Sequence, residues 1–205
     1  MNLMNRFKNN QDSLRLLYNS PHARETILEK IISWTPVSPQ DYVVACIGTD
    51  RSTGDALGPL VGTYLSEMKM RHMTVYGTLD NPIHATNLHD RLSDIRKFHR
   101  DPYMIAVDAC LGKKDSIGQL ITGTGAIKPG AALNKPLPEI GNLHITGVVN
   151  VGGFMEHAVL QNTRLSIVVD MAKQIASILH GLDEQMSYQT FRPAIIIPAR
   201  RKTMI

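Results

Sequence analysis

The sequence has few of the residues that mark specialised classes of protein. Only two cysteines, Cys46 and Cys110, occur in 205 residues. Two cysteines this far apart make no disulfide framework, which argues for a protein made in a reducing compartment. We expect both to be small buried side chains, with a nucleophile or a ligand as the alternative.

Long apolar runs and a strong excess of one charge are also missing. No apolar run approaches the ~20 residues needed to cross a bilayer, and the N-terminus carries no signal-peptide core. Lysine and arginine number 22 against 18 aspartates and glutamates. A nucleic-acid binder usually concentrates its basic residues in a patch or stripe. We therefore expect a soluble, cytoplasmic protein with no nucleic-acid or membrane partner.

Strand-like and helix-like segments alternate along most of the chain. Short apolar runs bounded by glycine and proline predict strands at 42–47, 74–78, 104–107, 117–127 and 144–149. Apolar residues at helical spacing predict helices at about 56–70, 84–99 and 163–180, the last capped by Gly181. This alternation favours an α/β fold, a three-layer α/β/α sandwich around a mostly parallel, twisted sheet. In the common strand order 2-1-3-4-5, the first and third strands are neighbours.

The first forty residues look separate from this alternation. A helix is expected to start near Ser20-Pro21-His22, and Pro36, Ser38 and Pro39 indicate a linker. We therefore expect an N-terminal appendage over residues 1–40 and a single α/β domain over residues 41–205.

The most informative stretch is residues 47–62, IGTDRSTGDALGPLVG, between the first strand and the first helix of the expected domain. It places Asp55 at a helix start, while Asp108 follows the strand at 104–107. Functional groups in parallel α/β folds lie beyond the carboxyl ends of strands, so the two carboxylates should face each other there. The helix N-terminus should favour ionised Asp55, and burial should raise the pKa of Asp108. Such a pair can divide acid and base roles, or hold a metal ion or a water molecule. The alternative is a purely structural role, because aspartate is common at helix N-caps and at strand ends.

The same stretch resembles a known family. GTDRSTGDALGP is similar to the first active-site loop of the spore germination protease family, which also ends in Asp-Ala-Leu-Gly-Pro, and IAVDA at 105–109 looks like its second motif. The likeness to this family continues downstream, at Thr122-Gly123, Pro129-Gly130 and Asn134-Lys135, and it covers residues 42–180 approximately. Taken as a whole, the sequence is most similar to a YyaC-like group of sporulation proteins, which are described as candidate spore proteases. The resemblance implies a peptidase with Asp55 and Asp108 as catalytic residues. It also implies a sporulation setting, in forespore or mother cell, and small acid-soluble spore proteins as substrate.

The hydrogenase maturation proteases share this fold, and resemblance to them implies a metal site. They hold metal with an acidic residue in the first loop, an aspartate after the third strand and a downstream histidine. Asp55, Asp108 and His144 match these positions, with Asp55 where that family usually has glutamate. Such ligands can hold zinc or nickel and lower the pKa of a bound water. Without metal, one carboxylate can activate the water while the other donates a proton, and His144 is then a strand-end histidine bonded to backbone.

Further positions are expected to line the cleft around this pair, namely Gly48, Thr49, Gly54, Gly58, His84, Asn150 and Gly152. The glycines after Asn150 permit close approach of a peptide backbone, with an ordinary turn as the alternative. His84 follows the second strand, and its alternative is a solvated helix start.

The sequence thus predicts an endopeptidase that acts on a protein or peptide, with its metal and oligomeric state left open. One alternative is a non-catalytic binding protein that retains the protease fold. The other is a metal-dependent maturation peptidase, in which nickel in the substrate marks the cleavage site.

Overall fold

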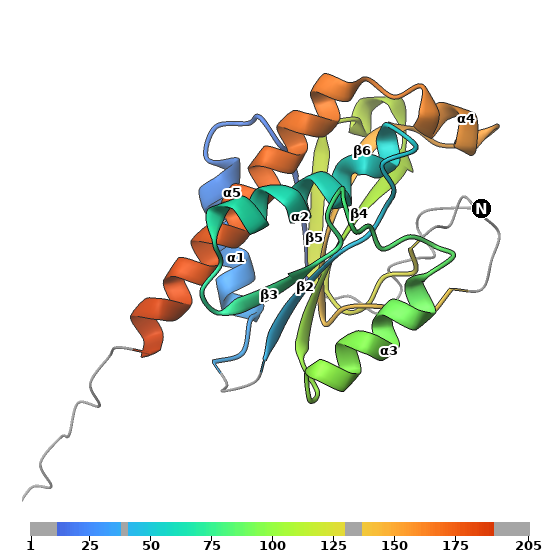
Figure 1. Ribbon diagram of the computed structural model, residues 1–205. Coiled ribbons are helices and arrows are strands. Elements are labelled where there is room, and N and C mark those ends of the chain that lie inside the picture. The colour runs from blue at the N-terminus through green and yellow to red at the C-terminus, as the bar shows by residue number, and fades with distance from the viewer. Residues whose placement is uncertain (1–11, 38–40, 130–136, 191–205) are drawn as a thin grey trace, which may run out of the picture.

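A computed structural model describes residues 12–37, 41–129 and 137–190 (Figure 1). Its centre is a six-stranded sheet with the order β1-β5-β6-β4-β2-β3. The strands are β1 (Ser13–Leu17), β2 (Tyr42–Cys46), β3 (Met73–Tyr76), β4 (Tyr103–Gly112), β5 (Gln119–Thr124) and β6 (Leu143–Val151). The helices are α1 (Ala23–Trp34), α2 (Leu57–Met68), α3 (Leu88–Phe98), α4 (Glu156–Gln161) and α5 (Leu165–Thr190), with short 3-10 helices η2 (Gly54–Ala56) and η3 (Lys114–Ser116).

Helices cover both faces of this sheet (Figure 1). Because successive strand residues point to opposite faces, each central strand contributes to two cores. Val44 and Ile105 pack in one core with apolar residues of α1, α2 and α5. Val43 and Met104, their chain neighbours, pack in the other core with α3. This three-layer arrangement confirms the predicted fold class.

The sheet is parallel over its central strands. β3, β2, β4 and β6 are successive parallel neighbours, whereas β5 runs antiparallel to both β6 and β1. The expected adjacency of the first and third strands is therefore confirmed. The predicted strand order 2-1-3-4-5 is wrong for its last two strands, since β6 lies between β4 and β5. The connection from Gly112 to Gln119 is too short for a parallel crossover, which needs about a dozen residues, so β5 has to run back.

Two expected element ends lie elsewhere in the structure. β4 continues to Gly112, so Asp108 lies within the strand and not after it. α5 continues to Thr190, so Gly181 is inside the helix and does not cap it. In both cases the strand or helix extends beyond the end that its sequence pattern predicts, because packing against other elements outweighs local propensity.

Residues 13–34, expected within an appendage, pack as part of the domain. β1 is an edge strand paired with β5. α1 begins close to the expected start and packs on α5, with Ile27 and Ile31 fully buried. Residues 130–136 of the expected loop, with Gly130 and Asn134-Lys135 of the family likeness, lie outside the described residues.

α5 packs one face against the larger core of the domain. Over Leu165–Ser187 it is long and apolar enough to cross a bilayer by length and composition. Its apolar face, however, is buried in the larger core, where Met171 and Ile175 are fully covered. The composition of α5 is therefore that of a core helix, and a cytoplasmic location stays a prediction.

Candidate functional site

The loop between β2 and α2 folds tightly because its glycines lie against backbone. A Cβ on Gly48, whose φ is +147°, would lie 1.9 Å from the carbonyl oxygen of Asp55. A Cβ on Gly58 would lie 2.1 Å from the carbonyl oxygen of Ile47. Two of the expected cleft glycines therefore bring the start of α2 onto the end of β2, and this sets the position of Asp55.

α4 supports this loop from the other side. A Cβ on Gly54 would lie 2.8 Å from Leu160 Cδ2 and 3.0 Å from Thr163 Oγ1. The Asn150 amide at the end of β6 donates to the carbonyl of Val159 at 3.3 Å and to Thr163 Oγ1 at 3.2 Å. Asn150, expected in the cleft, thus uses its amide group to join β6 to α4.

Asp55 lies in η2, half-buried at the start of α2. Its carbonyl accepts the backbone N–H of Thr49 at 3.1 Å, which holds this part of the loop closed. Burial raises the pKa of the Asp55 carboxyl, and the Ser52 side chain and the charge of His157 act against that rise. The expectation that the helix N-terminus favours ionised Asp55 is therefore wrong in its net direction, because desolvation is the larger effect.

Asp108 lies on β4 at the same edge of the sheet. It is paired with Thr146 of β6, one position beyond the last residue that β2 pairs with β4. Its Oδ1 accepts the backbone N–H of Ala109 at 2.9 Å. β4 and η2 are in contact, so the strand that carries Asp108 lies against the turn that carries Asp55.

His144 lies deeper in the sheet. It is paired with Ala106 of β4, while Asp108 is paired two positions further along. The ring is 1% exposed, and its Nδ1 donates to the carbonyl of Gly125 at 3.0 Å. Burial lowers its pKa, and the bond to Gly125 acts in the opposite direction.

This placement bears on the metal site that the resemblance implies. Within residues 12–37, 41–129 and 137–190, no group of three or more His, Cys, Asp or Glu side chains is placed to hold a metal ion. Asp55, Asp108 and His144 therefore do not form a three-ligand set for zinc or nickel, since a structural or catalytic zinc needs three or four converging donors. The geometry of His144 matches the alternative, a strand histidine bonded to backbone.

His84 lies beside the loop, as expected. Gly48 donates its backbone N–H to the carbonyl of Ile83 at 2.8 Å, which places His84 next to this part of the edge. The His84 backbone N–H donates to Asn87 Oδ1 at 2.8 Å, and its Nδ1 is 2.9 Å from Thr86 Oγ1. These contacts form the turn before α3, so His84 matches the alternative to a cleft-lining role, that of a residue at a helix start.

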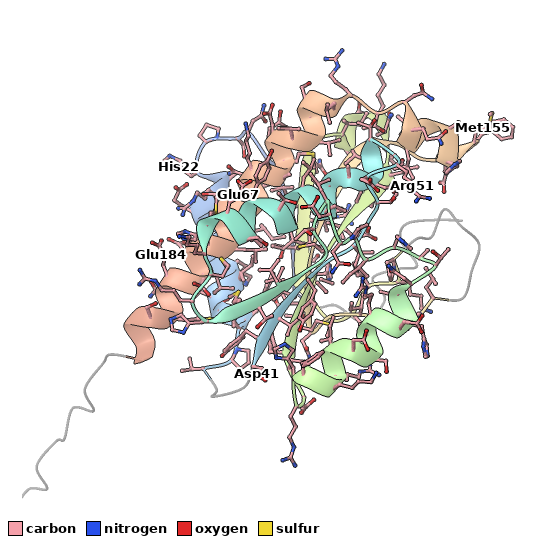
Figure 2. The ribbon with its side chains drawn as sticks, in the orientation of Figure 1. His22, Asp41, Arg51, Glu67, Met155 and Glu184 are labelled. Atoms are coloured by element: carbon pink, nitrogen blue, oxygen red, sulfur yellow. The ribbon has the colours of Figure 1, made fainter. Side chains whose placement is uncertain are left out.

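The segment between β6 and α4 carries two exposed apolar side chains. Gly152 donates its backbone N–H to the carbonyl of Gly112 at 2.8 Å, so the base of this segment is anchored to β4. Phe154 is 89% exposed and Met155 is 63% exposed. Figure 2 shows Met155 pointing away from the sheet at the outer end of the segment. We call Phe154 and Met155 the apolar tip.

Two residues near Asp55 were not singled out from the sequence. Ser52 is 4% exposed, and His157 of α4 is exposed but acts on the Asp55 carboxyl through its charge. The spacing Ser-x-x-Asp was a local signal for Ser52, because it is typical of a helix start. His157 had no such signal, since only the packing of α4 on η2 brings it near.

The cysteines differ in their surroundings. Cys46 is buried at the end of β2, and burial raises the pKa of its thiol far above the range in which a nucleophile would work. This confirms the expectation of a small buried side chain for Cys46. Cys110 of β4 is partly exposed, so that expectation is not met there.

Comparison with known proteins supports the fold and places the chain in a family. The structure of the NiFe hydrogenase maturation protease HycI from Thermococcus kodakarensis KOD1 matches with a TM-score of 0.50 and 18% identity, over 72% of this chain and 95% of that one. At this identity the likeness shows a shared fold alone. The Bacillus subtilis (strain 168) protein YyaC, described as uncharacterized, is 58% identical over 152 residues, which is 74% of this chain and 73% of that protein. Residues 15–178 match the family described as protein of unknown function DUF1256, and the chain belongs to that family.

Proposed function

We propose that this protein is a peptidase in which Asp55 and Asp108 activate a water molecule for attack on a peptide bond. The observation that carries the proposal is the contact between η2 and β4, which brings the segments bearing both carboxylates together at the carboxyl edge of the sheet. Groups at this edge are the usual working groups of parallel α/β folds. Because a maturation protease shares this fold, peptide hydrolysis is the first reaction class to test, by analogy of fold.

The raised pKa of Asp55 suits the role of general base. A base works best when its pKa approaches the working pH while it is still ionised. In the proposed reaction, Asp55 takes a proton from water as the water oxygen bonds to the peptide carbonyl carbon. The carbon–nitrogen bond then breaks, and the same proton passes to the leaving amine. Asp108 accepts a hydrogen bond from the water and orients it.

The apolar tip supports a polypeptide as substrate. Phe154 and Met155 are exposed directly before α4, the helix that packs on η2, whose turn carries Asp55. Apolar side chains beside a polar centre suit a chain that presents both a peptide bond and apolar side chains. Small acid-soluble spore proteins are the first substrates to test, in line with the family resemblance.

The test is incubation of purified full-length protein with small acid-soluble spore proteins, followed by mass spectrometry of the products. We expect defined fragments, with the rate reduced about 100-fold or more in Asp55→Asn and in Asp108→Asn, the usual range for loss of a general base. Asp50→Asn is the matched control, because Asp50 is an exposed aspartate of the same loop. That variant should cleave like the wild type.

Two other outcomes would change the proposal. Intact substrate with every variant, together with binding of the substrate, would favour a non-catalytic binding protein. If chelation abolishes cleavage and added zinc or nickel restores it, the enzyme depends on a metal ion. Residues 12–37, 41–129 and 137–190 would then hold that ion with fewer than three of their His, Cys, Asp or Glu side chains.

A further inference from the structure

The Ser52 hydroxyl is a buried polar group in the turn that leads to Asp55. The residue is 4% exposed, and among the residues described its Oγ has no hydrogen-bond partner. Buried hydroxyls in native proteins are nearly always bonded, so one without a partner calls for an explanation. The nearest explanation is the carboxyl group three residues along the chain.

The turn itself brings these two side chains together. The backbone N–H of Ala56 donates to the carbonyls of Ser52 at 3.0 Å and Thr53 at 3.3 Å, so residues 52–56 form a helical turn. Residues three apart on such a turn lie on the same side. The carbonyl of Asp55 is also held by the backbone N–H of Thr49 at 3.1 Å, which fixes the backbone from which the carboxyl extends. In agreement, the Ser52 side chain acts to lower the pKa of Asp55, against the larger effect of burial.

We propose that Ser52 is a positioning residue for Asp55, and that its buried hydroxyl donates a hydrogen bond to the ionised Asp55 carboxylate. A bond from O–H to a carboxylate is charge-assisted, so it tightens when Asp55 loses its proton. It therefore favours the ionised form and fixes the orientation of the carboxylate on a loop that is already closed. The catalytic meaning of this bond rests on the proposed peptidase function, but the bond itself does not.

Other charged groups near the turn have to be separated from Ser52. Elements α2, α4, α5 and β4 pack against η2. His157 of α4 lowers the pKa of Asp55 through its charge. The same loop and these four elements carry further ionisable groups, which in chain order are Asp50, Arg51, Tyr64, Glu67, Tyr103, Asp108, Cys110, Glu156, Asp170, Lys173, His180, Asp183 and Glu184. A variant at His157 therefore serves as an independent reference.

The experiment is a carbon-13 NMR titration of the full-length chain labelled at the aspartate carboxyl carbons. The Asp55 signal is assigned by its loss in Asp55→Asn. We expect Ser52→Ala to raise the Asp55 midpoint by about one pH unit, the size typical of one hydrogen bond to a charged group. Ser52→Cys keeps a weak donor and should give a smaller rise. Thr53→Ala removes the neighbouring hydroxyl and should leave the midpoint unchanged.

His157→Gln should raise the midpoint as well, and its effect should add to that of Ser52→Ala if the two act separately. An unchanged or lowered midpoint in Ser52→Ala would overturn the proposal. So would an equal rise in Thr53→Ala, because the effect would then belong to the turn and not to the hydroxyl. If the wild type cleaves peptides, the acid limb of its rate profile should shift with the NMR midpoint. Absence of cleavage would contradict the peptidase, while the titration would still decide the role of Ser52.

Discussion

Burial shifts the pKa values of Asp55 and His144, two residues that the resemblance placed in one site, in opposite directions. Both charged forms are disfavoured when water is removed, so the pKa of the carboxyl rises and that of the imidazole falls. Asp55 keeps enough exposure to reach solvent, as a reacting group requires. His144 is enclosed in the sheet, where its neutral ring donates to Gly125. Two residues expected in one site therefore lie in different surroundings.

The first prediction concerns the stability of Asp55→Asn. The folded state raises the pKa of Asp55 above its ordinary value of 3.8, so this residue stabilises the fold when protonated and that contribution is lost as pH rises through the folded pKa. At pH 7, Asp55→Asn should therefore increase the melting temperature, and the increase should shrink as pH falls toward 4. Thermal unfolding followed by circular dichroism measures this. An equal gain in Asp50→Asn would show a nonspecific effect of loop charge.

The second prediction concerns acid sensitivity at His144. Its folded pKa lies below the ordinary 6.5, so the unfolded chain binds the proton more readily and stability is lost as pH falls below about 6.5. His144→Gln should flatten the dependence of unfolding free energy on pH between 7 and 5. Urea unfolding at several pH values tests this. His89→Gln is the control, because His89 is exposed on α3, and it should leave the slope unchanged.

At the scale of secondary-structure elements, a glycine sets how closely the elements approach in two pairs, α2 with β2 and α5 with α1. α2 lies against β2 because Gly58 has no side chain, and the atom that a Cβ would meet is a backbone oxygen. α5 approaches α1 at Gly181, where a Cβ would meet Leu28 Cδ2 at 2.9 Å and Arg24 Nη2 at 3.0 Å. These are the ends of flexible side chains, which can move aside. The two helical glycines therefore differ in how firmly their positions are required.

The third prediction compares alanine at these two glycines. Gly58→Ala should lower the free energy of unfolding by about 3 kcal/mol or more, because backbone has to shift to admit the methyl group. Gly181→Ala should change it by less than about 1 kcal/mol, since the gain in helix propensity offsets the movement of Leu28 and Arg24. Denaturant unfolding of both variants measures the difference. A similar loss in both would show that α1 and α5 cannot adjust.

On the scale of the whole molecule, Asp183 of α5 joins the longest helix to the edge strand β3. Its carboxylate is buried and accepts three backbone N–H groups, from Arg71 at 2.8 Å, His72 at 2.8 Å and Met73 at 3.0 Å. Arg71 and His72 directly precede β3 and Met73 is its first residue, more than a hundred residues before Asp183 in the chain. Because one side chain of α5 accepts all three backbone N–H groups, it fixes this edge of the sheet relative to α5.

The fourth prediction follows from this contact. Asp183→Asn keeps the shape but replaces one acceptor oxygen by an NH₂ group that faces an N–H donor. The free energy of unfolding should fall by about 2–3 kcal/mol, the range for a lost bond to a charged group. Asp170→Asn, an exposed aspartate on the same helix, should change it by less than about 0.5 kcal/mol. Similar values for both variants would show that the β3 amides find other acceptors.

Several features followed from local pattern. The apolar runs and helical spacing predicted most elements, because side chains alternate on a strand and repeat along a helix face wherever those elements pack. The glycine-rich loop and the two aspartates were found the same way, since strand ends in parallel folds share an edge. Asp55 and Asp108 were therefore placed at one edge by sequence, although nothing local could show how η2 and β4 touch.

The sequence by itself determined the fold class, the adjacency of β2 and β4 and the positions of the two carboxylates along the chain. Only the tertiary structure decided that β6 lies between β4 and β5 and that β1 and α1 join the domain. It likewise decided that His144 forms no three-ligand set with the two carboxylates. It also decided the pKa direction of Asp55 and its nearness to His157. The reason is that burial and strand order depend on contacts between segments far apart in the chain, and these contacts leave no periodic signal in either segment alone.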